Sequence, residues 1–353
     1  MHMADALLAP AVAATMYAAT AVTVGASVKT LKKDETTAKL PTMAVTSALV
    51  FAGQMINYTI PGTGSSGHLC GGMMLTALLG PQAGFLSMVV ILSIQALFFA
   101  DGGLLALGAN CWNMAFYGCF VGYYLLWRPI MRSKLFAGLG SKAAARAKII
   151  LASVLGCVIT LQLGAFSVVL ETSASGITEL PFGAFVGIMQ PIHLAIGLVE
   201  GLITSAVLLF VYEARPELVM DVNTNGAAAK CSLRTTLVIL AVVVAIVGGG
   251  LSLFASSNPD GLEWSMFGNA EGGYSENMGL DEESYGISSG AAETAGAIQE
   301  KTAFLPDYAF SGSDSAVGTT VSGLLGSAIV AAAAVLVCLS GGFFRRKKAG
   351  AKA

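Results

Sequence analysis

Charged residues are scarce in this 353-residue chain, at 11% of the sequence, whereas a soluble domain carries about 25%. This shortage excludes an ordinary soluble enzyme. The net charge of -2 leaves no general basic field and so excludes a nucleic-acid partner. The six cysteines contain no CxxC pair, which argues against a disulfide framework and against a zinc cluster.

Two sequence signals are also missing. No Walker motif GxxxxGK[ST] occurs, so the chain is not expected to be an enzyme that hydrolyses ATP, and ATP energy would have to come from partner subunits. No Lys or Arg precedes the first apolar run, so the N-terminus lacks the basic region of a secretory signal. Because bulky His2 occupies the second position, we expect Met1 to be retained with a free amine.

Apolar residues, by contrast, make up 55% of the chain. They gather in runs that approach the roughly 20 residues needed for a helical membrane crossing. The pattern predicts an all-α, polytopic membrane protein with about nine transmembrane helices. The runs cover residues 6–28, 40–60, 68–80, 83–100, 103–127, 146–170, 183–212, 235–256 and 317–342.

The run at 68–80 is too short to be assigned as a crossing by length alone, so charge placement decides. If all nine runs cross and the N-terminus lies outside, every Lys and Arg except Lys301 faces the cytoplasm. Without this crossing, the six basic residues that follow Trp127 would be exported, against the positive-inside rule. The C-terminus is therefore expected to be cytoplasmic.

The crossings divide into a seven-helix unit, residues 1–212, and a two-helix unit, residues 235–353. A cytoplasmic linker, residues 213–234, joins them. The two-helix unit contains an outer loop, residues 257–316, with eleven acidic residues and Lys301 as its one basic residue. Such a composition buries too little apolar surface to fold by itself, so this acidic loop is expected to be solvated and partly flexible.

The chain has three histidines, and two of them, His2 and His68, lie at the predicted outer face. A chain that begins Met1-His2 offers an ion three nitrogens: the terminal amine, the His2 amide and the His2 imidazole. His68 could supply a fourth. A planar set of four nitrogens suits Ni(II) or Cu(II), whereas Zn(II) prefers tetrahedral sites. The alternative is that both histidines are ordinary exposed or interfacial residues.

Polar residues inside the apolar runs are further candidates. His193 and Glu200 lie seven residues apart and share one face of the seventh predicted helix, where ionisable groups mark a transport pathway or form a buried pair that ties helices together. Asn110 and Asn113 lie in the fifth run. We expect them to hydrogen-bond across helices, where they could also orient the metal ligands without contacting the ion.

Four separated segments, MHMADALL, GSSGHLCGG, ADGGLLALGANCWNMA and HLAIGLVEGLIT, resemble the CbiM or NikM family. This family is the substrate-binding component of energy-coupling factor transporters for nickel and cobalt. The resemblance covers residues 1–212 and implies a seven-helix unit with its N-terminus outside. It also implies an ion held by the Met1 amine, the His2 backbone and imidazole, and the His68 imidazole.

The same resemblance implies that the chain is the metal-capture and permease subunit of an ATP-driven importer in a prokaryotic inner (cytoplasmic) cell membrane. The partners would be a CbiQ-like or NikQ-like transmembrane coupling component and cytoplasmic CbiO-like or NikO-like ATPases. The ion would be a transported ligand, and no cofactor is expected. The forms SGHLxGG and DGGLLALGAN are similar to the nickel-type members, so nickel is expected first and cobalt second.

The opening departs from the usual family sequence MHIPDGFL. Met3, Ala4 and Ala6 replace Ile, Pro and Gly, which loosens the expected turn after the ligands. Asp5 is retained and is a candidate for supporting the metal site.

The second unit resembles the small accessory subunit, CbiN or NikN, fused to the first. The segment SSNPDGLEWS carries this match through five consecutive residues: Pro259, Asp260, Gly261, Leu262 and Glu263. Our hypothesis is that the acidic loop reaches over the metal mouth and helps to load or open it. The alternative is a tether with a stabilising turn.

Two other functions compete with metal capture. Gly64-Ser65-Ser66-Gly67 fits the short pattern GxSG, so Ser66 and His193 could form the nucleophile and base of an intramembrane serine protease. A proton-coupled secondary metal transporter that uses Glu200 and His193 is the second rival. It would take up metal without any ATPase subunit.

Overall fold

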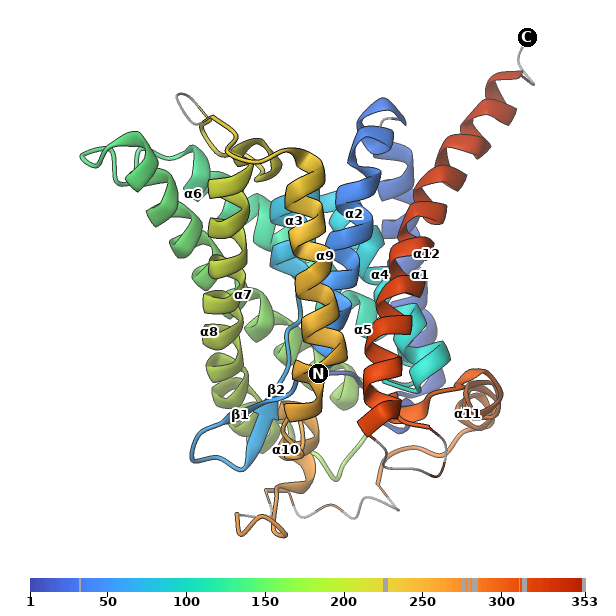
Figure 1. Ribbon diagram of the computed structural model, residues 1–353. Coiled ribbons are helices and arrows are strands. Elements are labelled where there is room, and N and C mark those ends of the chain that lie inside the picture. Colours follow the sequence, from blue (N-terminus) through green and yellow to red (C-terminus); the bar gives the residue numbers. More distant parts are fainter. Residues whose placement is uncertain are drawn as a thin grey trace.

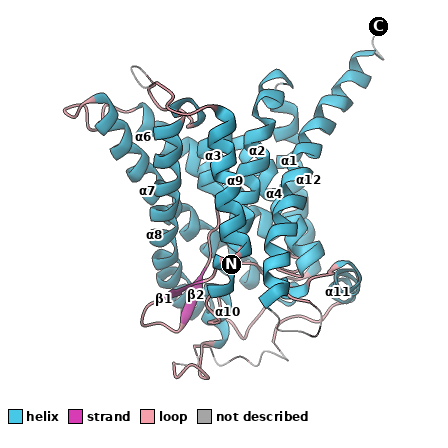
Figure 2. Cartoon of the chain, viewed as in Figure 1, coloured by secondary structure: helices cyan, strands magenta, loops and turns pink. Residues whose placement is uncertain are grey.

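The computed structural model describes the backbone of residues 1–31, 33–224, 228–274, 277–278, 280, 285–310, 312 and 316–350. Lys32, the Lys33 side chain and the basic side chains from Arg345 onward, which contribute to the charge argument, lie outside the described residues. The chain is mostly helical, with two short strands at one end (Figure 2). It is a polytopic helical membrane protein.

Long or directly consecutive helical elements form the bundle (Figure 1). They are α1 (Pro10–Thr30), α2 (Lys33–Gln54), α3 (Gly72–Leu79), α4 (Pro81–Phe99), α5 (Leu107–Asn110) with its π-helical continuation Cys111–Trp127 and α6 (Arg128–Arg132), α7 (Ser141–Ala174), α8 (Phe182–Ala214), α9 (Leu233–Gly249) and α12 (Ala316–Gly350).

Six helices in the described part of the chain are long and apolar enough to cross a membrane. They span Pro10–Thr30, Pro81–Phe99, Ser141–Ala174, Phe182–Ala214, Leu233–Phe254 and Ala316–Val337. Apolar side chains such as Leu170, Leu198 and Leu202 are exposed on the outside of α7 and α8. A lipid-facing surface accounts for this exposure, since the bilayer replaces water there. The total of nine crossings stays a prediction.

The short third run does connect the two ends of the bundle. Its extended first part follows the hairpin of β1 (Tyr58–Ile60) and β2 (Ser65–Gly67), and α3 completes the path. At the far end, the Ala77 carbonyl accepts from Met220 N at 2.8 Å. Every residue of α3 is buried. A non-helical backbone is tolerated at this depth because protein, not lipid, surrounds it.

The segment that follows α8 is more ordered than a linker composition suggests. Trp127 Nε1 donates to the Met220 carbonyl at 3.0 Å, and Asp221 accepts from the Tyr123 hydroxyl at 2.6 Å. Arg132 also pairs with Asp221 at 2.5 Å. These contacts fix the start of the linker against the end of the bundle that lies opposite the hairpin.

At the hairpin end, the acidic loop contains α10 (Gly261–Phe267), α11 (Gly290–Thr302) and a 3₁₀ turn, Pro306–Tyr308 (Figure 1). Most described residues of this loop are exposed or half-buried, as its composition suggests, but a few apolar residues are buried. Leu262, Met266 and Leu305 are each at most 3% exposed. The composition did not indicate this burial, because these few apolar residues dock on a surface that the bundle already provides, and so need no core of their own.

Candidate metal centre

The N-terminal segment is held inside the bundle by its own backbone. Met3 N donates to Asn110 Oδ1 at 2.7 Å, and Asn110 Nδ2 donates to the Met3 carbonyl at 3.2 Å. That carbonyl also accepts from Gly103 N at 2.9 Å. Asp5 Oδ1 then accepts from Ala106 N at 3.0 Å. Asn110 and Asp5 therefore position the residues that flank Met1 and His2, as the sequence suggested for supporting groups.

A glycine is required where this segment crosses the α4–α5 connection. A Cβ on Gly103 would lie 1.9 Å from Asp5 Oδ1 and 2.5 Å from the Asp5 backbone nitrogen. Any side chain at position 103 would therefore push the N-terminal segment away from its place.

His68 lies on the extended segment between β2 and α3. The Glu200 carboxylate of α8 accepts from Cys70 N at 3.0 Å and from Gly71 N at 2.9 Å, which fixes this segment. His68 Nδ1 lies 3.0 Å from the Leu69 carbonyl oxygen. Because a carbonyl can only accept, Nδ1 carries the proton and Nε2 presents a lone pair.

That lone pair is directed at the chain terminus. The Met1 amine lies 3.3 Å from His68 Nε2 in a buried position. The rings of His2 and His68 stack with centroids 5.1 Å apart and an interplanar angle of 19°. Neighbouring nitrogens bound about 2.0 Å from one ion in a planar set lie about 2.8 Å apart. Met1 and His68 are therefore close to the separation that a shared ion requires.

Asp260 of the acidic loop closes the site from outside. Its Oδ2 accepts from the Met1 amine at 2.6 Å. Its Oδ1 caps α10 by accepting from Leu262 N at 2.8 Å and Glu263 N at 3.0 Å, and Glu263 returns a contact to Asp260 N. The Asp260 carboxylate thus caps the N-terminus of α10 and also neutralises the Met1 ammonium. Burial acts to raise the pKa of Asp260, but the Met1 amine and His68 outweigh it and hold the pKa well below its usual range.

His2 is held by a second carboxylate. His2 Nδ1 lies 3.1 Å from Asp101 Oδ1, and the other Asp101 oxygen accepts from the Tyr308 hydroxyl at 2.5 Å. Burial lowers the pKa of His2, although Asp101 opposes this effect. Sequence reasoning missed both Asp101 and Tyr308. The lone acid at the end of an apolar run was a usable signal for Asp101, whereas no local pattern marks Tyr308.

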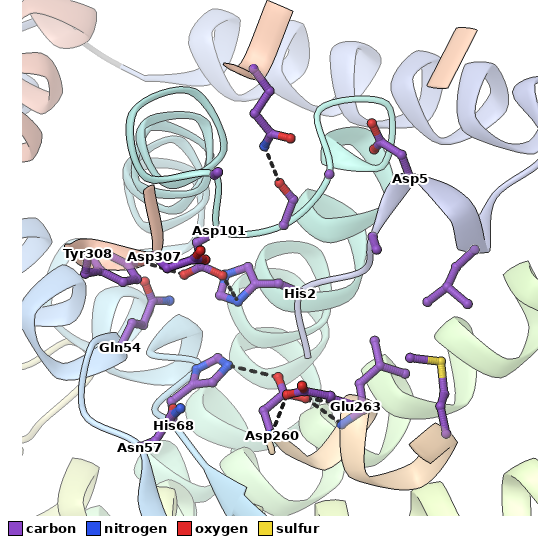
Figure 3. Close-up of a pocket in the computed structure, with 18 of the residues that line it drawn as sticks. His2, Asp5, Gln54, Asn57, His68, Asp101, Asp260, Glu263, Asp307 and Tyr308 are labelled. Carbon is purple, nitrogen blue, oxygen red and sulfur yellow. Dashed lines mark hydrogen bonds and ion pairs between the residues drawn. The ribbon is translucent and has the colours of Figure 1, made fainter. Parts of the chain in front are cut away.

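A cavity of about 670 Å³ lies beside these groups. His2, His68, Asp101, Asp260 and Tyr308 all line it, and Figure 3 shows the contact between His68 and Asp260, whose Nε2 and Oδ2 lie 3.8 Å apart. Within the described part of the chain, no three His, Cys, Asp or Glu side chains converge as a metal-binding group. A four-nitrogen site here depends on the terminal amine and the backbone.

The remaining candidate residues do other things. Asn113 donates to Glu171 at 2.8 Å and contacts the Met3 sulfur, so it supports the N-terminal segment one step further from Met1. His193 Nδ1 bonds the Met189 carbonyl at 2.8 Å. His193 and Glu200 share α8, but Glu200 ties this helix to the segment before α3. Of the two readings of the pair, the contacts of Glu200 favour a link between segments.

Ser66 is occupied by the acidic loop. Its hydroxyl donates to the Asn258 carbonyl at 2.8 Å, and its amide donates to the Pro259 carbonyl at 2.8 Å. Among the described residues, no hydrogen bond joins Ser66 to His193. The contacts that Ser66 makes therefore give the protease hypothesis no support.

Comparison with known proteins gives two family matches. Residues 2–218 match CbiM, described as the cobalt uptake substrate-specific transmembrane region, and residues 234–340 match the PDGLE domain. The chain is 33% identical over 339 residues to a putative fused nickel transport protein NikMN of Archaeoglobus fulgidus, covering 94% of this chain and 96% of that protein.

A fused nickel transport protein NikMN of Rhodobacter capsulatus is 32% identical over 350 residues, which cover 94% of this chain and 95% of the relative. Among solved structures, the crystal structure of a truncated transition metal transporter is 32% identical. It covers 60% of this chain and 99% of that one, with a TM-score of 0.48.

Proposed function

Because the chain belongs to the CbiM family and carries a PDGLE domain, we propose that it is the substrate-capture and permease subunit of an ATP-driven importer of Ni(II), with Co(II) as the second candidate ion. It acts in the prokaryotic cytoplasmic membrane with a CbiQ-like or NikQ-like coupling component. Cytoplasmic CbiO-like or NikO-like ATPases supply the energy. Fused nickel transport proteins among its relatives support nickel as the first choice.

The observation that carries this proposal is the 3.3 Å separation between the Met1 amine and His68 Nε2 at a buried site. The ligands are the Met1 amine, the His2 amide nitrogen, the His2 imidazole and the His68 imidazole. These donors close adjacent chelate rings around one ion. A planar nitrogen field suits Ni(II). The deprotonated His2 amide carries one negative charge, which offsets one unit of the charge on the ion.

The acidic loop covers the site in this proposal. Asp260 neutralises the Met1 ammonium while the site is free of metal, and it must release the amine when the ion takes that nitrogen. The hairpin is attached to the same loop through Ser66 and Pro259. The loop therefore links release of Met1 to the segment that carries His68, which favours a part in loading over a simple tether.

Nickel titration of the purified full-length protein tests the ligand set. The wild-type chain is expected to bind one Ni(II) per chain. Acetylation of the Met1 amine should abolish binding, and His68→Ala should weaken it strongly, because each removes a required donor. Tyr274→Phe, in the acidic loop and 44% exposed, is a matched control. Stoichiometric binding by the N-acetylated protein would contradict the proposal.

The energy source needs a separate measurement. Cells that carry the chain together with its coupling and ATPase partners should accumulate nickel. A catalytically inactive ATPase should stop uptake while leaving nickel binding to the purified chain unchanged. Uptake that continues without ATPase activity would instead support the proton-coupled alternative with Glu200 and His193.

A further inference from the structure

A tyrosine from the two-helix unit reaches the N-terminal ligand through one intermediate. The Tyr308 hydroxyl donates to Asp101 Oδ2 at 2.5 Å, and Asp101 Oδ1 lies 3.1 Å from His2 Nδ1. Figure 3 shows this line of residues along one wall of the cavity. Tyr308 and His2 are separated by nearly the whole sequence, so the contact joins the two units at the metal centre.

The position of Tyr308 is defined on all sides. Its ring stacks on Phe99 with centroids 4.9 Å apart. It also packs against Phe51 in a T-shaped arrangement with centroids 6.2 Å apart. The hydroxyl also accepts from Gln95 Nε2 at 3.2 Å. Burial, assisted by the Asp101 carboxylate, raises the pKa of Tyr308 well above its usual value. The hydroxyl therefore keeps its proton and stays a donor.

The backbone around this tyrosine is held in an uncommon conformation. Asp307 and Tyr308 have φ values of 49° and 59°, in the left-handed region that non-glycine residues seldom adopt. Such backbone persists only where surrounding contacts determine it, and it occurs preferentially at functional sites. Here it directs the Tyr308 hydroxyl at Asp101.

Asp101 is fixed from its other side by α4. Ala100 ends this helix with a φ of 55°, and Asp101 N donates to the Gln95 carbonyl at 3.1 Å. Gln95 therefore contacts Asp101 through its backbone and Tyr308 through its side chain, and it also donates to Gln54 at 3.0 Å. The Gln95 contacts therefore fix both the backbone of Asp101 and the hydroxyl of Tyr308 that donates to its carboxylate.

The contact between Asp101 and His2 determines which nitrogen of the His2 ring can bind an ion. The chelate from the His2 amide closes as a six-membered ring through Nδ1, the nitrogen that Asp101 now contacts. His2 Nε2 is buried and, apart from the Gln95 side chain that interacts with this ring, has no polar partner among the described residues. A half-turn about Cβ–Cγ moves Nε2 to the present position of Cε1, next to Asp101, and turns Nδ1 away. Nδ1 is then free for an ion, and Nε2–H has a carboxylate acceptor.

We propose that Tyr308 is a positioning residue for the metal centre: it orients Asp101 so that this carboxylate holds the ring of His2 and receives Nε2–H when Nδ1 binds the ion. This inference rests on the proposed ligand set. A carboxylate on the outer nitrogen of a ligating histidine fixes the ring and makes it a stronger donor. The two-helix unit thus tunes a ligand that belongs to the seven-helix unit.

The test is Ni(II) titration of the full chain, with the ligand-field absorption band of the bound ion as a second readout. Tyr308→Phe keeps the ring and removes the hydroxyl. Nickel affinity should fall about 10- to 100-fold, the range for loss of such a supporting contact, and the absorption band should shift. Asp101→Asn, which leaves the aromatic packing of Tyr308 intact, should do the same. Tyr274→Phe should change neither readout.

The double variant separates positioning from packing. If Tyr308 acts through Asp101, the effects of Tyr308→Phe and Asp101→Asn on affinity will be far from additive. Unchanged affinity in Tyr308→Phe, or weaker affinity with an unshifted band and additive effects, overturns the inference. Either result leaves the proposed function standing as long as the wild-type chain binds Ni(II) and His68→Ala binds it much more weakly. Failure of the wild-type chain to bind would instead overturn the proposed function.

Discussion

The terminal amine of Met1 donates to Oδ2 of Asp260 at 2.6 Å, across 259 positions of the sequence. The first residue of the seven-helix unit therefore forms an ion pair with the helix cap of the acidic loop. An ion that binds the Met1 nitrogen must compete with this pair. The metal-free form is accordingly expected to depend on Asp260 more strongly than the metal-loaded form.

Asp260→Asn should destabilise the metal-free protein more than the loaded one. Asn still caps α10, but it leaves the buried Met1 ammonium without a negative partner, at a cost of about 1–3 kcal/mol. Thermal unfolding with and without Ni(II) measures the difference. Exposed Glu300→Gln on α11 is the control and should change neither form. Equal destabilisation of both forms would show that Asp260 has only a structural role.

Gly103→Ala should displace the N-terminal segment. The new Cβ would lie 2.5 Å from the Asp5 backbone nitrogen, a separation that real contacts do not show. Because ligand geometry must hold within about 0.5 Å, nickel affinity should fall about 10-fold or more. Gly138→Ala, where a Cβ would have no neighbour within 4 Å, is the matched control for titration. Equal affinities in the two variants would mean that the segment adapts freely.

Glu200→Gln should loosen the segment that carries His68. Glutamine keeps one acceptor oxygen, but its amide group would face the N–H of Cys70 or Gly71, since both carboxylate oxygens now accept. A buried donor without an acceptor costs about 1–3 kcal/mol. Unfolding stability and nickel affinity should therefore fall together. Glu171→Gln tests a buried carboxylate on α7 instead and should leave nickel affinity nearly unchanged, because glutamine can still accept from Asn113.

The stability of the metal-free protein should decrease as the pH falls below about 6.5, the pKa of an unfolded histidine. Burial lowers the pKa of His2, so in this range the unfolded chain binds a proton that the folded chain does not. Stability therefore rises with pH there. His2→Gln should make the pH profile of unfolding shallower between pH 7 and 5. An unchanged slope would show that His2 does not contribute.

How much of the fold and of the metal site could be predicted from the sequence depends on how far apart in the chain the interacting residues lie. Met1, His2 and His68 were predicted as neighbours from donor chemistry and family resemblance, and the structure brings Met1 and His68 within 3.3 Å. Asp5 and Asn110 were predicted to support the site, and both hold the N-terminal segment. The expectation of a solvated acidic loop did not include its docking on the bundle, because average composition conceals the few apolar residues, such as Leu262, that dock it.

The sequence by itself determined the membrane class and the order of the helices, because apolar runs and capping signals act over a few residues. It also determined the type of ligands on offer. Only the tertiary structure decided that Asp260 meets Met1 and that Tyr308 reaches His2 through Asp101. These groups lie more than 200 positions apart in the chain, and no local periodicity encodes which side chain of a distant loop will face a given nitrogen.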